Sequence, residues 1–255
     1  MHAMVLKTYL ENLDLKPSQP YVSKRITLGV AAPELPRLGE NEQAFFSERS
    51  ILSFASGVSE QSRKDILNTT LLAQMAANSR SNDQADITNW YYAFIDVLMK
   101  TGWVIEGGDM QTFKSKSNLF EAESVVIDIL TSAFGAGYIT VIKKTLEAIK
   151  HLASADRKIK AFEQNTSKVS KGCFQIALVT EEHGVMAMKI GTFILSSERQ
   201  ITTILFFTST SEETSLDYIS KKATLNTDFY QVIRQKVTEK LGNFLFTNIA
   251  EIKLA

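Results

Sequence analysis

The feature that most constrains the fold is a series of three strand-like segments that begins at the chain's single cysteine, Cys173. The segments cover 174–179, 185–195 and 201–208, and short polar stretches separate them. In the first segment large apolar side chains occupy alternate positions, which is typical of a strand that turns one face to a core. Because all three are rich in β-branched and aromatic residues, they predict an antiparallel meander over about 173–208.

Earlier in the chain, between residues 46 and 165, apolar residues recur mainly with helical spacing. Ser59 is expected to cap the first helix, because its hydroxyl can accept from the free amides of the first turn. The expected helices cover 59–77, 88–100, a stretch ending at Phe134 that follows a capping box at 118–121, 140–152 and 155–164. Two adjacent glycines inside 103–116 predict a small β-hairpin between the second and third helices.

After the meander, a weaker strand is expected at 216–225, then a helix at about 228–241 and a closing strand over 244–254. All four prolines lie in residues 1–45, which predicts an irregular arm, with an edge strand at about 21–30. The predicted fold class is α+β, in which a helical N-terminal half packs on a mostly antiparallel C-terminal sheet. We expect one domain spanning 1–255, with 46–165 mainly helical and 173–255 mainly β.

The charge balance argues against one class of function. The chain of 255 residues has 28 basic and 28 acidic residues, so it lacks the basic excess usual in nucleic-acid binders. One cysteine excludes an internal disulfide, and the first residues show no charged start followed by an apolar block. We therefore expect a cytoplasmic protein, or one secreted without a cleaved signal peptide.

Residues 124–142 are the most apolar window, and Asp128 is the only charged residue in it. Its length approaches that of a bilayer span, but a charge is costly in lipid, and Gly135 and Gly137 interrupt the middle. One interpretation is a pair of buried helices joined by a glycine turn. The other is a helical hairpin that leaves the fold and enters a membrane, with the glycines as its hinge. The core or membrane-active residues of this hairpin are Val125, Val126, Ile129, Leu130, Phe134, Ile139 and Ile142.

Cys173 is the second candidate site. A lone cysteine is commonly a small buried hydrophobic residue. Alternatively, if the thiol lies near Lys168 and Lys171, they would lower its pKa and favour the reactive thiolate, which suits covalent modification by a fatty acyl chain. A catalytic thiol would need a histidine, and only His151 can approach, because His183 lies in the turn at the far end of the expected hairpin.

Other chemistry has little support in the sequence. One cysteine and three scattered histidines do not match the spacing of a metal site. The glycine pairs lack the lysine of a phosphate-binding loop, and no Gly-x-Ser-x-Gly motif occurs. We therefore expect no metal, no catalytic residue and no cofactor other than a covalent fatty acyl group. The expected partners are a lipid or membrane, or a protein that the sequence does not specify.

Three parts of the chain resemble the Evf-type bacterial virulence factors. They are residues 51–54 followed by 67–74, residues 90–103, and the late single Cys173 before a β-rich end. The resemblance concerns the layout of most of the chain. It implies a mixed α/β fold, export or release from the cell, a fatty acid carried on a cysteine through a thioester, and association with membranes. Acylation would carry over to Cys173.

These observations lead to three hypotheses. The first is a non-enzymatic, membrane-directed virulence or toxin-like protein, S-acylated at its single cysteine. The second is a soluble binding or assembly module that keeps an unmodified, buried thiol. The third is an enzyme of unknown type that uses Cys173.

Overall fold

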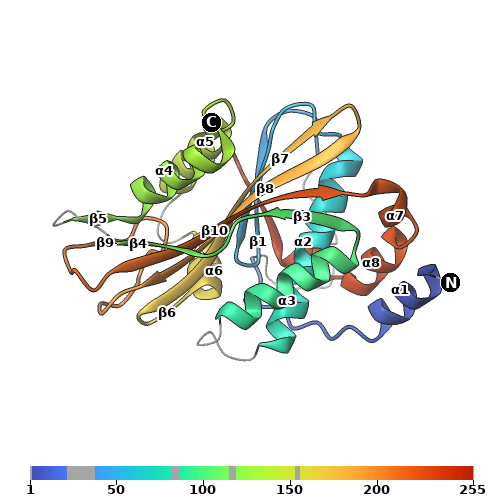
Figure 1. Ribbon diagram of the computed structural model, residues 1–255, viewed down its shortest axis with the longest axis horizontal. Coiled ribbons are helices and arrows are strands. Elements are labelled where there is room, and N and C mark those ends of the chain that lie inside the picture. Colours follow the sequence, from blue (N-terminus) through green and yellow to red (C-terminus); the bar gives the residue numbers. More distant parts are fainter. Residues whose placement is uncertain (1, 22–37, 82–86, 115–118, 153–155, 255) are drawn as a thin grey trace, which may run out of the picture.

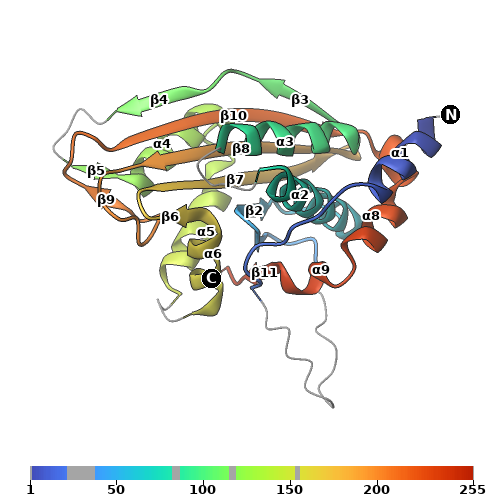
Figure 2. The ribbon, with the colours of Figure 1, turned by 90° about the horizontal axis from the view of Figure 1, so that it is seen from below.

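A β-sheet forms the middle layer of the molecule, and helices cover both of its faces (Figure 1). The computed structural model describes residues 2–21, 38–81, 87–114, 119–152 and 156–254. Figure 2 shows the strands one above another, from β3 and β4 at one edge of the sheet to β11 at the other edge. The bounds of β3 are Trp103–Gly107, those of β4 are Gln111–Lys114, and those of β11 are Ile249–Ile252.

The strand order is β11-β1-β2-β7-β8-β10-β3. The remaining strands of this path are β1 (Gln43–Ser47), β2 (Ser50–Phe54), β7 (Lys171–Glu182), β8 (Val185–Ser196) and β10 (Ser215–Leu225). Neighbours pair antiparallel except β2 and β7, which are parallel. β4 adds to β10 and the short β6 (Ser167–Lys168) to β7, while β5 (Phe120–Glu121) and β9 (Thr208–Ser209) form a separate pair.

The helices divide between the two faces. One face carries α1 (His2–Glu11), α2 (Glu60–Arg80), α3 (Ile87–Lys100), α7 (Thr227–Gln231), α8 (Arg234–Leu241) and α9 (Phe244–Thr247). The other carries α4 (Ala122–Phe134), α5 (Ile139–Lys150) and α6 (Arg157–Thr166). We call the two cores the α2–α3 core and the α4–α5 core.

The two cores follow from the alternation of side chains along the strands. In β7, Phe174 and Ile176 point into the α4–α5 core, whereas Cys173, Ala177 and Val179 point into the α2–α3 core. Successive side chains of a strand point to opposite faces, so a strand that is apolar on both sides needs helices on both sides. The predicted α+β fold with a mostly antiparallel sheet is confirmed, although β1 and β2 come before α2 and all later helices in the sequence.

Local signals placed the first helices correctly. Ser59 is the N-cap of α2 and its side chain accepts from the Ser62 amide, as expected. The structure extends α2 to Arg80 and places α3 where helical spacing predicted it. The helix expected at about 228–241 is present as α7 and α8, and Gly242 is the C-cap of the second.

The prediction of a third meander strand at 201–208 is wrong. Most of 201–208 is irregular chain, and only Thr208 begins a short strand, β9. Ile204 and Phe207 are nevertheless buried, because this segment fills the α4–α5 core from the side. The actual third strand is β10, which pairs with β8 from Ser215 to Thr224. Apolar composition alone does not distinguish a buried loop from a strand.

The prediction of a β-hairpin at 103–116 is also wrong. β3 and β4 do not pair with each other; both pair with β10, β3 with Lys221–Leu225 and β4 with Ser215–Tyr218. The glycines at 107–108 therefore interrupt one edge strand instead of reversing the chain.

Three further expectations need correction at the ends of elements. The supposedly irregular arm begins with α1, whose Leu10 packs in the α2–α3 core. The closing strand is α9 followed by β11. The N-cap of α4 is Glu121, without a side-chain cap bond. The proposed cap Asn118 and nearly all of the edge strand at 21–30 lie outside the described residues.

Candidate functional site

The apolar window at 124–142 forms α4 and α5, which pack against each other over one face of the sheet (Figure 1). They join at an exposed turn in which Gly135 has a φ of 91°, a conformation that favours glycine. A Cβ at Gly135 or Gly137 would meet nothing within 4 Å, so the space around both glycines is open. We call residues 129–142, which contain no charged residue, the hairpin tip.

The residues singled out from the sequence lie on this hairpin, and five are buried: Val126, Leu130, Phe134, Ile139 and Ile142. Val125 and Ile129 are half-buried. Asp128 is exposed, so the one charge of the window faces water. None of the described helices is both long and apolar enough to span a membrane.

The hairpin packs directly on the sheet at Gly191 of β8. A Cβ there would lie 2.8 Å from Leu130 Cδ2 and 2.9 Å from Phe193 Cε2. Both distances are shorter than an ordinary carbon contact of about 3.5 Å. The missing side chain of Gly191 therefore allows Leu130 of α4 to reach the strand.

Polar contacts add to this packing. Ser53 Oγ of β2 and Thr145 Oγ1 of α5 form a buried hydrogen bond of 2.9 Å. Lys189 of β8 donates from Nζ to the carbonyl oxygen of Phe134 at 2.7 Å, at the end of α4. The same ammonium lies 4.7 Å from the centroid of the Tyr138 ring in the turn. A hairpin that leaves the sheet must break these contacts.

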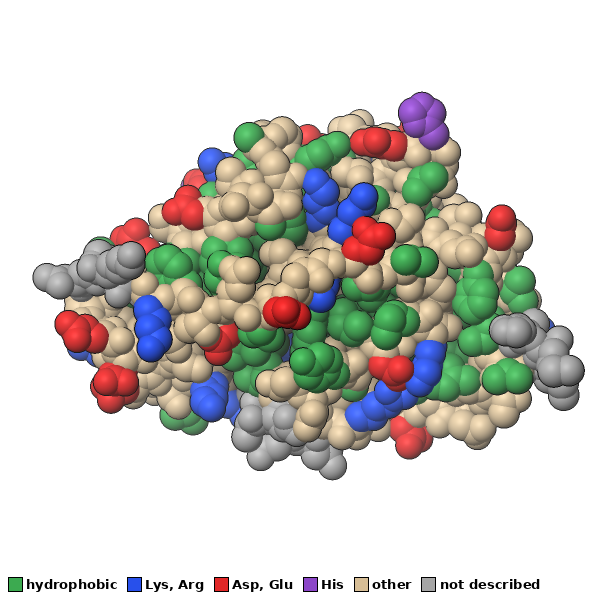
Figure 3. Space-filling model, viewed as in Figure 1, with side chains coloured by type: hydrophobic (Ala, Val, Ile, Leu, Met, Phe, Trp, Pro, Cys, Tyr) green, Lys and Arg blue, Asp and Glu red, His purple; other side chains and the backbone are tan. Residues whose placement is uncertain are grey.

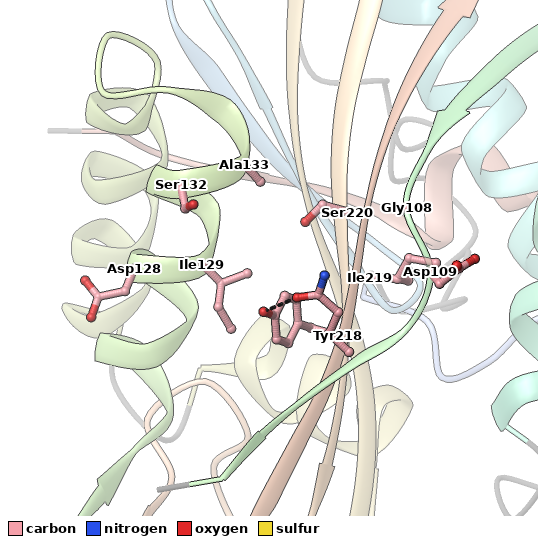
Figure 4. Close-up of a pocket in the computed structure, with 10 residues that line it drawn as sticks. Gly108, Asp109, Asp128, Ile129, Ser132, Ala133, Tyr218, Ile219 and Ser220 are labelled. Carbon is pink, nitrogen blue, oxygen red and sulfur yellow. Dashed lines mark hydrogen bonds between the residues drawn. The ribbon is translucent and has the colours of Figure 1, made fainter. Parts of the chain in front are cut away.

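An open groove of about 430 Å³ separates α4 from the nearby strand edge. Ile129 and Ala133 line its helix side, and Tyr218 and Ser220 of β10 line the other (Figure 4). The Asp128 side chain points away from the groove in this view, and Tyr218 donates from its hydroxyl to Gln111 Oε1 at 2.6 Å. The lining therefore mixes apolar side chains with uncharged polar ones, and its charged residues are Asp109 and Asp128.

A second hollow of about 500 Å³ continues this groove past Ala133 and is basic. Lys189 and Lys222, which we call the lysine pair, are directly opposite each other on β8 and β10. Basic side chains gather over the strands beside α4 and α5 (Figure 3). On the next strand Glu106 is the register partner of Lys222. The salt bridges found in the described part of the chain include neither lysine.

Cys173 lies on the opposite face of the sheet from the hairpin, in the α2–α3 core. It is 1% exposed. Burial raises the pKa of its thiol to about 11, and the neighbouring Arg49 guanidinium acts in the other direction without offsetting that effect. The expectation that Lys168 and Lys171 lower this pKa is wrong, because both lysines are exposed and burial dominates. The structure therefore separates the two candidate sites.

Two charged residues, Glu48 and Arg49, form the turn between β1 and β2 and are both buried. The Glu48 carboxylate accepts from Asn248 Nδ2 at 2.8 Å and from Asn78 Nδ2 at 3.2 Å, while burial raises its pKa. The Arg49 guanidinium lies 4.9 Å from the Trp90 ring centroid, and its Nε has no hydrogen-bond partner among the described residues. The thiol thus has a buried, incompletely paired guanidinium as its neighbour.

The structure does not bring His151 or His183 to Cys173. His151 pairs with Glu147 at 2.9 Å at the end of α5, in the layer on the opposite face of the sheet. His183 lies in the exposed turn between β7 and β8, with a φ of 51°. The described residues contain no group of three or more His, Cys, Asp or Glu side chains that could hold a metal ion.

Sequence reasoning missed the lysine pair and the buried turn. Lys189 and Lys222 are 33 positions apart in numbering, and only the register of β8 on β10 makes them neighbours. Ser-Glu-Arg-Ser at 47–50 has the composition of an exposed turn, so nothing local indicated that Glu48 and Arg49 are buried. The apolar face of the hairpin, in contrast, was visible from its periodicity.

No protein-family model and no curated protein matches this chain. Solved structures with a similar backbone include a delta-endotoxin, 11% identical over 83% of this chain and 92% of that chain, with a TM-score of 0.44. Another is the Evf virulence factor, 12% identical over 94% and 90% of the two chains, with a TM-score of 0.42. A third is the activated Cyt2Ba monomer from Bacillus thuringiensis subsp. israelensis, 14% identical over 49% and 68%, with a TM-score of 0.23. The weak Evf-type resemblance seen in the sequence is thus also found in the backbone, and at these values it says nothing about activity.

Proposed function

We propose that this is a non-enzymatic, toxin-like virulence protein that acts at a membrane, and that the α4–α5 hairpin meets the bilayer. The observation that carries the proposal is the hairpin tip. Its 14 consecutive residues, 129–142, carry no charge, and its turn is exposed, with open space around Gly135 and Gly137. A surface element of this kind can enter the bilayer interface without burying a charged group.

The packing of the hairpin supports the same function. Full burial of a Val, Leu, Ile or Phe side chain is worth about 1.5–3 kcal/mol. Apart from Thr145, the buried residues of α4 and α5 are apolar, and so are sheet residues beneath them such as Phe174 and Phe193. If the helices parted from the sheet within lipid, both surfaces would remain out of water. The polar contacts of Ser53 with Thr145 and of Lys189 with Phe134 would oppose that movement.

A fluorescent label tests this contact. A cysteine placed at the exposed Ala136 in a Cys173→Ala background would carry an environment-sensitive dye at the turn. The matched control is Val232→Cys, because that residue is 48% exposed and lies beside α7 on the other layer. On phospholipid vesicles, the dye at 136 should brighten and shift to the blue, and the control dye should not. Vesicle binding without any change at 136 would exclude the hairpin as the contact. Absence of binding both in this Cys173→Ala background and with Cys173 intact would exclude the membrane function.

We further propose that Cys173 carries a fatty acyl chain as a thioester. In the transfer, the thiolate of Cys173 attacks the carbonyl carbon of an acyl thioester donor, whose thiolate leaves and takes up the proton that Cys173 gave up. Support comes from Arg49, because a guanidinium with an unpaired N–H beside the sulfur can donate to the thioester carbonyl oxygen. Since the thiol is buried with a raised pKa, the acyl chain would be attached before α2 and α3 close over it.

Intact mass before and after hydroxylamine tests the acylation, because hydroxylamine cleaves thioesters. The protein should be purified from the cells that make it, and it should lose the mass of one acyl group and then gain a free thiol. An untreated mass equal to that of the bare chain would remove the acyl group from the proposal.

The second candidate function is a soluble binding or assembly module with an unmodified thiol. The observation that favours it is the 1% exposure of Cys173 among packed apolar side chains. This alternative predicts a bare intact mass and no partition into vesicles of any composition.

A further inference from the structure

The lysine pair is an unfavourable arrangement for the isolated fold. Like charges directly opposite each other on neighbouring strands destabilise a sheet by roughly 0.2–1 kcal/mol. The register of β10 on β8 fixes Lys189 and Lys222 in this relation, on the face of the sheet that carries α4. Glu106 is the one acid in register with them, and it is not within salt-bridge distance among the contacts of the described residues. An anion bound between the two ammonium groups would turn this repulsion into attraction.

The contacts of the two lysines leave them free to bind such an anion. Lys189 makes a neutral contact with the Phe134 carbonyl and lies against the Tyr138 ring. Lys222 is exposed. A second acid, Glu182, accepts from the Tyr138 hydroxyl at 3.2 Å. Lys189 and Lys222 thus line the 500 Å³ hollow together with Ala133 and Phe134 of α4. Its other charged lining residues are Lys221 and Glu106.

We propose that the lysine pair binds the phosphate of an anionic phospholipid within a bilayer. This inference rests on the proposed membrane function and specifies its partner. Lys189 contacts both ends of the turn that joins α4 and α5, so cationic groups and the uncharged hairpin tip form one continuous surface. A cationic surface next to an uncharged one matches a bilayer, in which charged headgroups lie directly above the apolar layer. Tyr138 is 36% exposed at the junction, and tyrosine is enriched at the membrane–water interface.

The test compares vesicles of phosphatidylcholine alone with vesicles of phosphatidylcholine and phosphatidylglycerol, using the full-length protein. The test variant carries Lys189→Gln with Lys222→Gln. The control carries Lys168→Gln with Lys171→Gln, which removes the same charge from another lysine pair placed opposite each other on β6 and β7, away from the hairpin. The variant Lys189→Arg with Lys222→Arg keeps both charges and checks that substitution at these two positions does not itself abolish binding.

The test variant should bind anionic vesicles roughly tenfold to thirtyfold more weakly, as expected for the loss of two basic residues near an anionic surface. The control and the arginine variant should bind like the wild type. All four proteins should bind phosphatidylcholine vesicles alike.

Equal losses in the test and control variants would overturn the proposal, because only net charge would then matter. Unchanged binding of the test variant would overturn it and leave the membrane function standing. No binding by the wild type to either vesicle would overturn both. Binding of inorganic phosphate by the lysine pair, without a preference for anionic vesicles, would replace the lipid with a free anion.

Discussion

The half-buried carboxyl of Glu163 makes the stability of this fold depend on pH. Its Oε2 atom accepts a hydrogen bond from the Ile204 amide at 2.8 Å, which joins α6 to the buried irregular segment before β9. Burial raises the pKa of Glu163 from 4.5 to about 7, and the one amide hydrogen bond offsets only part of that effect. Ionising this carboxyl therefore costs about 3 kcal/mol more in the folded than in the unfolded protein.

The sign follows from proton binding. Between pH 4.5 and about 7 the folded protein holds more protons at Glu163 than the unfolded chain does. The free energy of unfolding therefore falls as the pH rises through this window, and the loss is nearly complete above the folded pKa. Glu163→Gln keeps an oxygen acceptor for the Ile204 amide but cannot ionise. It should match the wild type near about pH 5 and exceed it by about 2–3 kcal/mol near about pH 8.

Urea unfolding across this pH range, followed by the emission of the buried Trp90 and Trp103, measures the difference. Glu198→Gln is the control, because Glu198 is exposed. Burial also raises the pKa of Glu48, so the wild-type curve falls for two reasons, and the gap between wild type and variant isolates Glu163. A gap that stays constant across the pH range would show that Glu163 ionises normally in the fold.

Three other substitutions or reactions test the packing. Gly191→Ala should destabilise the fold by about 1–3 kcal/mol, because its Cβ would lie 2.8 Å from Leu130 Cδ2. The control Gly137→Ala, which has open space around it, should change thermal unfolding little. Equal effects of the two substitutions would contradict the close contact at Gly191. Asp65→Ala should cost about 1–3 kcal/mol, because the buried carboxylate pairs with Arg234 at 2.8 and 2.9 Å and the guanidinium left behind is 35% exposed. A double-mutant cycle with Arg234→Ala should give a clear coupling instead of additive losses. Maleimide should alkylate any unacylated Cys173 at least about a hundredfold more slowly in the native protein than in urea, and comparable rates would contradict its burial.

What could be predicted from the sequence was mainly what local physics determines. The Ser59 cap and the apolar period of α3 depend on residues within a few turns of each other, and both are found where expected. The segment 201–207 shows the limit, because a loop that packs into a core has the same apolar composition as a strand. The Gly107–Gly108 pair shows another limit. Whether glycines reverse a chain or interrupt an edge strand depends on whether a strand such as β10 is available to pair with both halves.

In the candidate sites, too, local spacing predicted some features, and tertiary packing determined the others. The apolar face of α4 was visible from its spacing, and the structure buries Val126, Leu130 and Phe134. The face on which Cys173 lies could not be known, because alternation shows only that Cys173 and Phe174 point to opposite sides. Which helices cover each side depends on tertiary packing, and the lysine pair depends on strand register.

The sheet separates the two features that the sequence connected with membranes. A fatty acyl chain on Cys173 would lie in the α2–α3 core, while the hairpin tip belongs to the opposite face. One bilayer surface therefore cannot engage both without a large rearrangement, so one feature must dominate binding. An acyl chain of about sixteen carbons would contribute on the order of 10 kcal/mol if it entered the bilayer. Cys173→Ala should thus abolish vesicle binding if the chain is the membrane contact. If the hairpin is the contact, Cys173→Ala should bind like the wild type, and the Lys189→Gln, Lys222→Gln variant should be the weaker one.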